Sequence, residues 1–118
     1  MANVVNPVIT KGLNHAVVQW KNLDGTTNTS GALTQMPGFE LESVHIDGTT
    51  LTGAITMWGT NYDDGTGTVV ALKDQSNTAI TTTAAAAFFL RVGMNFIQPK
   101  VASGSSGVNV TAYYRRAL

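Results

Sequence analysis

A chain of 118 residues has the usual length of one domain, so a single hydrophobic core suffices and no second domain is expected. Only 12% of its residues are charged, well below the roughly 25% of typical globular proteins, and seven Lys and Arg balance seven Asp and Glu. This balance excludes a long-range field that would attract nucleic acid, an anionic membrane or a polyanionic substrate, and it favours association with other protein subunits.

The chain contains no cysteine, which excludes disulfides, thiolate metal sites, iron–sulfur clusters and thiol nucleophiles. No stretch approaches the roughly 18 apolar residues needed to cross a bilayer, and residues 1–10 lack the basic and apolar parts of a secretion signal. We therefore expect a protein that folds in the cytoplasm of its host and is stabilised by packing.

The first third of the chain predicts strands separated by turns, because Thr, Val and Ile are frequent and their branched side chains pack well on a pleated surface. Residues 15–20 are the first expected strand. A turn follows at 24–25, since Asp and Gly tolerate positive φ. Residues 26–33 are then expected to return as a second segment.

Residues 39–60 predict a β-hairpin. Apolar and acidic residues alternate over 39–42, and the apolar phase then slips by one residue at Ser43. Such a slip indicates a β-bulge, or else a strand that is buried differently at its two ends. An Asp-Gly turn at 47–48 would lead into a returning strand with its apolar residues on one face over 51–57.

The second half predicts further short strands. A polar loop is expected at 61–67 and a strand at 69–74. A turn at 75–77 then leads into a second short strand at 78–82. The alanine-rich segment 83–92 predicts a tight helical turn, or a loop that runs into a strand. The last two strands, 95–101 and 108–115, are expected to pair across a flexible SGSSG connector at 103–107.

About eight short strands with short connections predict an all-β fold, an antiparallel β-sandwich or a jelly-roll-like barrel, in a single domain over residues 1–118. Residues 1–12 have two interpretations. They form an extended N-terminal arm that adds a strand to a neighbouring subunit, or they are the first edge strand of their own sheet. Val4, Val5 and Val8 are accordingly candidate interface residues.

Acidic and histidine side chains do not occur in catalytic or metal-binding patterns. Glu40 and Glu42 are expected to share the solvent face of one strand. The pair at 63–64 lies in a loop without the spacing of a calcium loop. His15 and His45 each lack a second ligand two to four residues away.

The sequence also lacks complete nucleophile and cofactor-binding motifs. The serines of 103–107 lack the pattern of a nucleophile elbow, and the glycines of 65–70 lead into a strand where a dinucleotide fingerprint needs a helix. We predict no catalytic, cofactor-binding or metal-binding residue, no cofactor and no enzymatic activity.

Four residues near the C-terminus, Tyr113, Tyr114, Arg115 and Arg116, combine aromatic rings with cations. Such residues can stack on single-stranded nucleic acid, but the net charge is zero and no second basic cluster exists, so no nucleic-acid partner is expected. The expected role is contact with acidic groups on a neighbouring subunit.

The two tryptophans fit either of two roles, as core residues or as interface anchors. Trp58 and the nearby Tyr62 are included among the candidate interface residues.

The second half contains, in chain order, a strand that ends in Trp58-Gly59-Thr60-Asn61, a strand with Leu72-Lys73-Asp74, then Ile80, an aromatic strand, Gln98-Pro99-Lys100-Val101 and a closing Gly107-Val108-Asn109-Val110-Thr111. Over residues 50–116 the chain resembles small structural proteins of tailed bacteriophages, especially capsid decoration or cement proteins. The resemblance implies a virion protein on the outer capsid surface, a homo-oligomer, trimer in preference to dimer, that binds the major capsid protein and stabilises the shell. It assigns no role to any single residue.

Two alternatives remain open. One is a structural subunit of the phage tail or fibre base. The other is a small carbohydrate-binding β-sandwich module that uses Trp20, Trp58 and Tyr62 as stacking surfaces. No membrane partner is expected for any of these.

Overall fold

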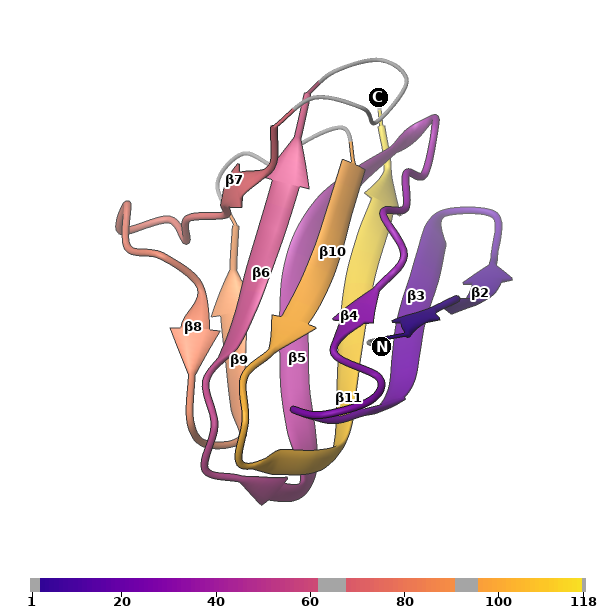
Figure 1. Ribbon diagram of the computed structural model, residues 1–118. Coiled ribbons are helices and arrows are strands. Elements are labelled where there is room, and N and C mark those ends of the chain that lie inside the picture. Colours follow the sequence, from indigo (N-terminus) through magenta and orange to yellow (C-terminus); the bar gives the residue numbers. More distant parts are fainter. Residues whose placement is uncertain (1–2, 62–67, 91–95, 118) are drawn as a thin grey trace.

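Two β-sheets face each other in the computed structural model, which describes residues 3–61, 68–90 and 96–117 (Figure 1). These residues contain eleven strands and no helix. Sheet A has the spatial order β1 (Val4–Val5), β4 (Ser30–Gly31), β10 (Phe96–Val101), β6 (Ile55–Thr60) and β7 (Val70–Ala71), with β8 (Thr81–Thr82) also paired to β6. Sheet B has the order β2 (Val8–Lys11), β3 (His15–Leu23), β11 (Ser105–Arg116), β5 (Phe39–Leu51) and β9 (Ala86–Phe89).

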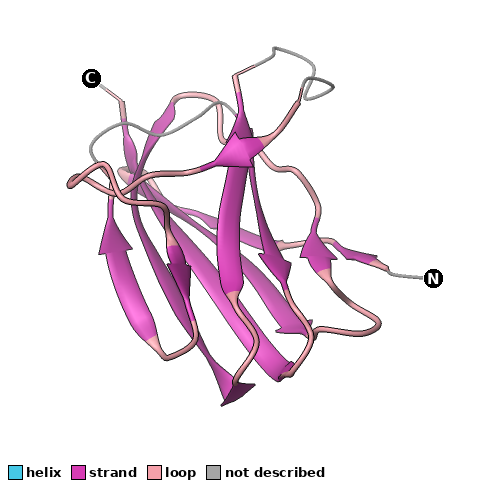
Figure 2. Ribbon diagram, turned by 60° about the vertical axis from the view of Figure 1, so that its left-hand side comes forward, coloured by secondary structure: helices cyan, strands magenta, loops and turns pink. Residues whose placement is uncertain are grey.

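The strands pair antiparallel throughout, except for the parallel pair β1–β4. The all-β prediction is confirmed, and the sheets lie as two layers, as in a sandwich (Figure 2). More strands are present than expected because β1, β4, β7 and β8 contain only two residues each.

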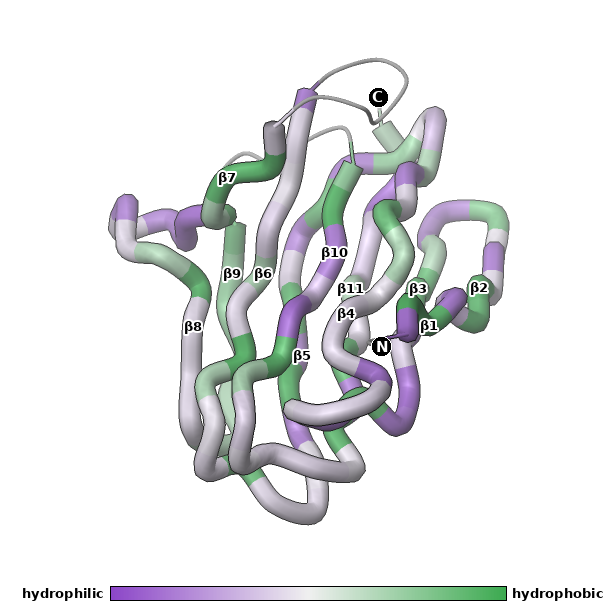
Figure 3. Tube along the Cα trace, in the orientation of Figure 1, coloured by the Kyte–Doolittle hydropathy of each residue, from purple (hydrophilic) through white to green (hydrophobic). Residues whose placement is uncertain are grey.

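The core lies between the two sheets. Trp20 and Ile46 from sheet B and Met57 and Ile97 from sheet A are fully buried there. Figure 3 shows hydrophobic and hydrophilic residues alternating along β5, which is the pattern of a strand with one face on the core. Burial of each such large apolar side chain contributes about 1.5–3 kcal/mol.

The bulge predicted near Ser43 is confirmed. Tyr113 of β11 is opposite Ser43, whereas the next residue, Tyr114, is opposite Leu41, so Glu42 is the extra residue of β5. The bulge shifts the alternation by one position, and the apolar residues on both sides of it therefore face the core.

The predicted hairpin over 39–60 is wrong. β5 continues through Gly48 and pairs with β11, while β6 belongs to the other sheet. Gly48 lies opposite Val108, and a Cβ atom there would be 2.9 Å from the main-chain oxygen of Gly107. The glycine thus permits a close approach of two strands and does not form a turn.

The expected pairing of the last two strands is also wrong. β10 pairs with β4 and β6 in sheet A, and β11 pairs with β3 and β5 in sheet B. The chain crosses between the sheets at 102–104, and Ser105 is the buried first residue of β11. A short polar connector fits a crossing between stacked sheets as well as it fits a hairpin.

Sheet crossings meet at one end of the sandwich. The main-chain nitrogen of Gly25 donates to the oxygen of Ser105 at 2.9 Å, and the Ser105 hydroxyl donates to the oxygen of Gly53 at 2.6 Å. A Cβ atom at Gly25 would lie 2.2 Å from the oxygen of Ala102, and one at Gly53 would lie 2.2 Å from the oxygen of Ser103. Glycine is required at both positions because the crossing backbones touch.

The N-terminal segment pairs within its own chain. Val4 of β1 is opposite Ser30 of β4, and Ile9 of β2 is opposite Val18 of β3. For the part of residues 1–12 that the structure describes, the segment therefore forms edge strands of its own sheets and not an arm that leaves the domain. The segment expected to return over 26–33 contains β4, which lies in sheet A and not beside β3.

The alanine-rich segment runs into a strand, β9, which pairs with β5. Its last residues, 91 and 92, lie outside the described residues. The strands expected at 69–74 and 78–82 are reduced to β7 and β8, with a bridge between Lys73 and Ala79 and a turn that places Asn77 at a φ of 62°.

Candidate functional site: the outer face of sheet B

The candidate interface residues do not form one cluster. The alternation along each strand places Val4 and Trp58 on the outer face of sheet A, and Val8, Tyr113 and Arg115 on the outer face of sheet B. Val5 packs against the core, Tyr114 lies in it, Arg116 lies at the end of β11, and Tyr62 is outside the described residues.

Sheet B contains the three longest strands, β3, β5 and β11, and their outer face is therefore the longer of the two surfaces along the strands. Its strands are joined in continuous ladders, so outward side chains stand in rows that cross the sheet. From β2 to β9, the row through Tyr113 contains Thr10, Val17, Tyr113, Ser43 and Phe89. The row through Thr111 contains Val8, Gln19, Thr111, His45 and Ala87.

Aromatic rings lie near the middle and at one edge of this face. Tyr113 is 37% exposed, and its ring stacks on that of His15 with a centroid distance of 6.0 Å and an interplanar angle of 15°. Phe89 on β9 is 58% exposed. Phe89 was not among the predicted interface residues, although its alternation with the partly buried Phe88 was a usable signal.

Arg115 contacts an acidic side chain of its own chain. Its Nε lies 3.7 Å from a carboxylate oxygen of Glu42, and Glu40 is its partner in the strand register. Both side chains of the ion pair are well exposed, so the pair adds little to stability. The bulge residue Glu42 thus lies on the same outer face as the arginine.

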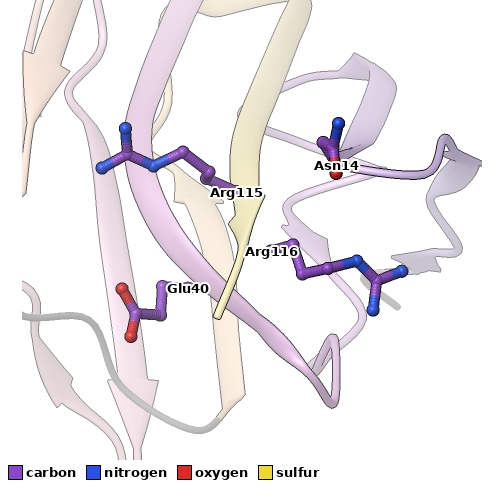
Figure 4. A pocket seen from close by; sticks show the side chains of 4 residues that line it. All are labelled: Asn14, Glu40, Arg115 and Arg116. Carbon is purple, nitrogen blue, oxygen red and sulfur yellow. The ribbon is translucent and has the colours of Figure 1, made fainter. Parts of the chain in front are cut away.

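Arg116 lies on the other side of the strand. Its guanidinium is 5.0 Å from the centre of the Phe39 ring, and its Nε donates to the main-chain oxygen of Leu13. A pocket of about 440 Å³ at this end is lined by Asn14, Glu40, Arg115 and Arg116. Figure 4 shows Arg115 and Glu40 pointing away from Arg116 and Asn14, so the two guanidinium groups do not converge on one ligand.

Tyr114 is a core residue and not an interface residue. It is only 4% exposed, and this burial raises the pKa of its phenol well above the ordinary value of 10.0. The alternation along β11 explains the difference between the two tyrosines, since adjacent side chains point to opposite faces.

The two tryptophans have different environments. Trp20 is fully buried, so it cannot serve as a stacking surface for a sugar, and the carbohydrate alternative loses one of its three aromatic residues. Trp58 is partly buried on the outer face of sheet A, where the Lys100 ammonium lies 5.1 Å from its ring centre.

Exposed apolar side chains occur on each strand that ends a sheet. Val4 on β1, Val70 on β7, Val8 on β2 and Phe89 on β9 are 50–61% exposed. Lys11 is the only charged residue in these four strands. Sheet edges are commonly protected by charges, and these edges have almost none.

Within the described ranges, no three His, Asp or Glu side chains are grouped so that they could hold a metal ion. The same residues form no helix long and apolar enough to span a membrane. No protein-family model matches the chain, and comparisons with curated proteins and with solved structures give no match.

Proposed function

We propose that this protein is a virion structural subunit, a decoration protein that binds the outer surface of a capsid shell and stabilises it. The observation that carries the proposal is the set of apolar edge strands. Each sheet ends in strands whose large apolar side chain is at least half exposed and whose only charge is Lys11.

Such edges suit a subunit of an assembly. An edge strand has unpaired main-chain groups, and apolar side chains beside them make pairing or packing with another chain favourable. A solitary protein would gain solubility from charges at these places. The balance of seven cationic and seven anionic residues also leaves little repulsion between copies.

The mechanism is multivalent burial. A decoration subunit that touches several shell proteins, or that is itself an oligomer, makes its later contacts at high effective concentration. Each contact can then be weak, and the shell gains stability because the bound form is favoured over the dissociated one. The likeness of residues 50–116 to phage decoration proteins supports this form of assembly over others.

The test is co-sedimentation with shells assembled from the major capsid protein without this chain. The proposal predicts saturable, stoichiometric binding. Val4→Lys and Val70→Lys, at the two edges of sheet A, are expected to lower the bound fraction several-fold. Thr50→Lys, at another exposed position but in sheet B, is the control and should bind as the parent chain does.

Shells that sediment without the chain at every ratio would overturn the capsid proposal. Equal binding by the edge variants and the control would overturn the role of the sheet A edges.

A further inference from the structure

We propose that two copies of this chain form a dimer by packing the outer faces of sheet B against each other, about a two-fold axis that runs along β11. The dimer does not depend on a shell, so it goes beyond the proposed function. The inference rests on where the register places charges and exposed apolar side chains on this face.

Carboxylates lie on one of the two strands that flank β11, and a lysine lies on the other. On β5, the outer face carries Glu40, Glu42 and Asp47 together with His45, whose Nε2 is 3.9 Å from a carboxylate oxygen of Asp47; on β3 it carries His15 and Lys21. At each end of the face, one row of residues crosses all three strands. His15 and Glu40 are both opposite Arg115, in one row.

The second charged row lies at the other end of the face. Asn109 is opposite Asp47 on one side, and on the other side it stands at the register shift of β3 between Trp20 and Leu23. Lys21 lies in that shift and is exposed. Lys21 and Asp47 are therefore at the same height along β11, on opposite sides of it.

A two-fold rotation about an axis along β11 keeps each row at its height and exchanges the two sides. It places β3 of one copy over β5 of the other. Lys21 then faces Asp47 of the second copy, and His15 faces Glu40 of the second copy, each twice in the dimer. Gln19 faces His45 of the second copy, which is a polar match. Arg115 lies near the axis, where its own Glu42 balances its charge.

The apolar residues match under the same rotation. Tyr113 lies on the axis strand and meets Tyr113 of the second copy. Phe89, on the last strand of the sheet, is carried over the first strand, β2, of the second copy. There it meets the region of Thr10 and Val8, and Val8 is itself 56% exposed. The two most exposed apolar groups of the face are thus buried together.

The other face-to-face arrangement, with its two-fold axis across the strands, is disfavoured by the same charges. It would keep β5 over β5 and reverse the rows, so Asp47 would face Glu40 and Lys21 would face His15. Two carboxylates opposite each other cost free energy and reduce association, and Lys21 has no carboxylate partner in this arrangement. The charge pattern therefore selects one of the two arrangements.

The dimensions of the face suit a weak dimer. Three strands about 4.8 Å apart and about 20 Å long between Asn109 and Arg115, with the four-residue strands β2 and β9 on either side, cover about 400 Å² per copy. Two copies bury about 800 Å², which is in the range of weak and transient interfaces. Facing sheets lie about 10 Å apart, a distance that a lysine and an aspartate can bridge together.

The experiment is sedimentation equilibrium of the full chain and of charge-exchanged variants. The parent chain should have twice the monomer mass of 12.4 kDa. Lys21→Asp alone and Asp47→Lys alone should each weaken the dimer at least tenfold. The double variant Lys21→Asp/Asp47→Lys should restore the dissociation constant to within a few-fold of the parent, because the exchanged charges face each other again.

Lys73→Asp is the matched control, since Lys73 is exposed and lies outside sheet B. Circular dichroism of each variant separates loss of the dimer from loss of the fold. A monomer or a trimer for the parent chain would overturn the inference, and so would single variants that dimerise normally or a double variant that stays monomeric. Failure of shell binding would leave the dimer intact, so the two proposals fail separately.

Discussion

The indole Nε1 of Trp20 donates a hydrogen bond to the main-chain oxygen of Ala32 at 3.2 Å, which joins β3 of sheet B to the segment that follows β4 of sheet A. The ring also occupies the space beside Gly31. A Cβ atom at Gly31 would lie 2.3 Å from Cδ1 of Trp20 and 2.7 Å from Cδ of Pro99. The Trp20 ring therefore leaves no room for any side chain at position 31.

Gly31→Ala should lower the free energy of unfolding by about 1–3 kcal/mol, because the added methyl group displaces the buried Trp20 ring. Urea unfolding followed by tryptophan fluorescence measures the change. Ser30→Ala, in the same strand but with its side chain on the opposite face, is the control and should change the stability by less. Equal stability of Gly31→Ala and the parent would show that the ring can move without cost.

Deletion of Glu42 should be tolerated. The deletion removes the bulge and leaves Leu41, Val44 and Ile46 in regular alternation, at the cost of about 1 kcal/mol for the hydrogen bond from the Leu90 nitrogen to the Glu42 oxygen. Deletion of His45 instead leaves Glu42 in place and makes Val44 and Ile46 adjacent in the strand. Their side chains then point to opposite faces, so Val44 turns to solvent if Ile46 stays in the core. This second deletion should cost about 3 kcal/mol. Thermal unfolding of both variants compares them, and equal losses would contradict the bulge.

The Asp24 carboxylate accepts hydrogen bonds from the main-chain nitrogens of Thr27, Thr26 and Asn28, and these bonds, that from Thr27 most of all, lower its pKa below the ordinary 3.8. A lowered folded-state pKa gives stability that is present above pH 3.8 and is lost as the pH falls through the folded-state value. Asp24→Asn should therefore have a lower melting temperature than the parent at neutral pH, and the gap should close in acid. A gap that is constant with pH would contradict this role of the charge.

Tyr114 should make the protein sensitive to alkali. Burial raises the phenol pKa above the ordinary 10.0, so the stability that the neutral side chain provides is complete below pH 10 and decreases as the pH rises above it. Tyr114→Phe removes the ionisable group, and its melting temperature should fall less steeply than that of the parent above pH 10. Parallel curves would contradict the burial of this hydroxyl.

The sequence predicted the strands far better than their partners. Alternation of apolar residues identified β3, β5 and β11, and its slip at Ser43 offered the bulge as one of two explanations, because burial of one face acts on each residue locally. The pairing of β10 with β6, and of β11 with β5, depends on which layer a short connector enters. That choice is made by contacts such as Gly53 against Ser103, which no local pattern contains.

The candidate surface was predicted in part. Tyr113 and Arg115 were found through their residue types, but their separation from Tyr114 and Arg116 follows from the two faces of β11. The placement of Lys21 and Asp47 on opposite sides of β11, at the same height, could not be predicted from the sequence. It depends on the order of β3, β11 and β5 in sheet B, which no local pattern contains.

Differential scanning calorimetry of capsid shells, with and without this protein, tests the proposed function most directly. Shells assembled from the major capsid protein alone should melt at a higher temperature after the chain is added, and the shift should saturate at a fixed ratio of subunits. A melting temperature that stays the same at every ratio would contradict the proposal that this protein stabilises a shell.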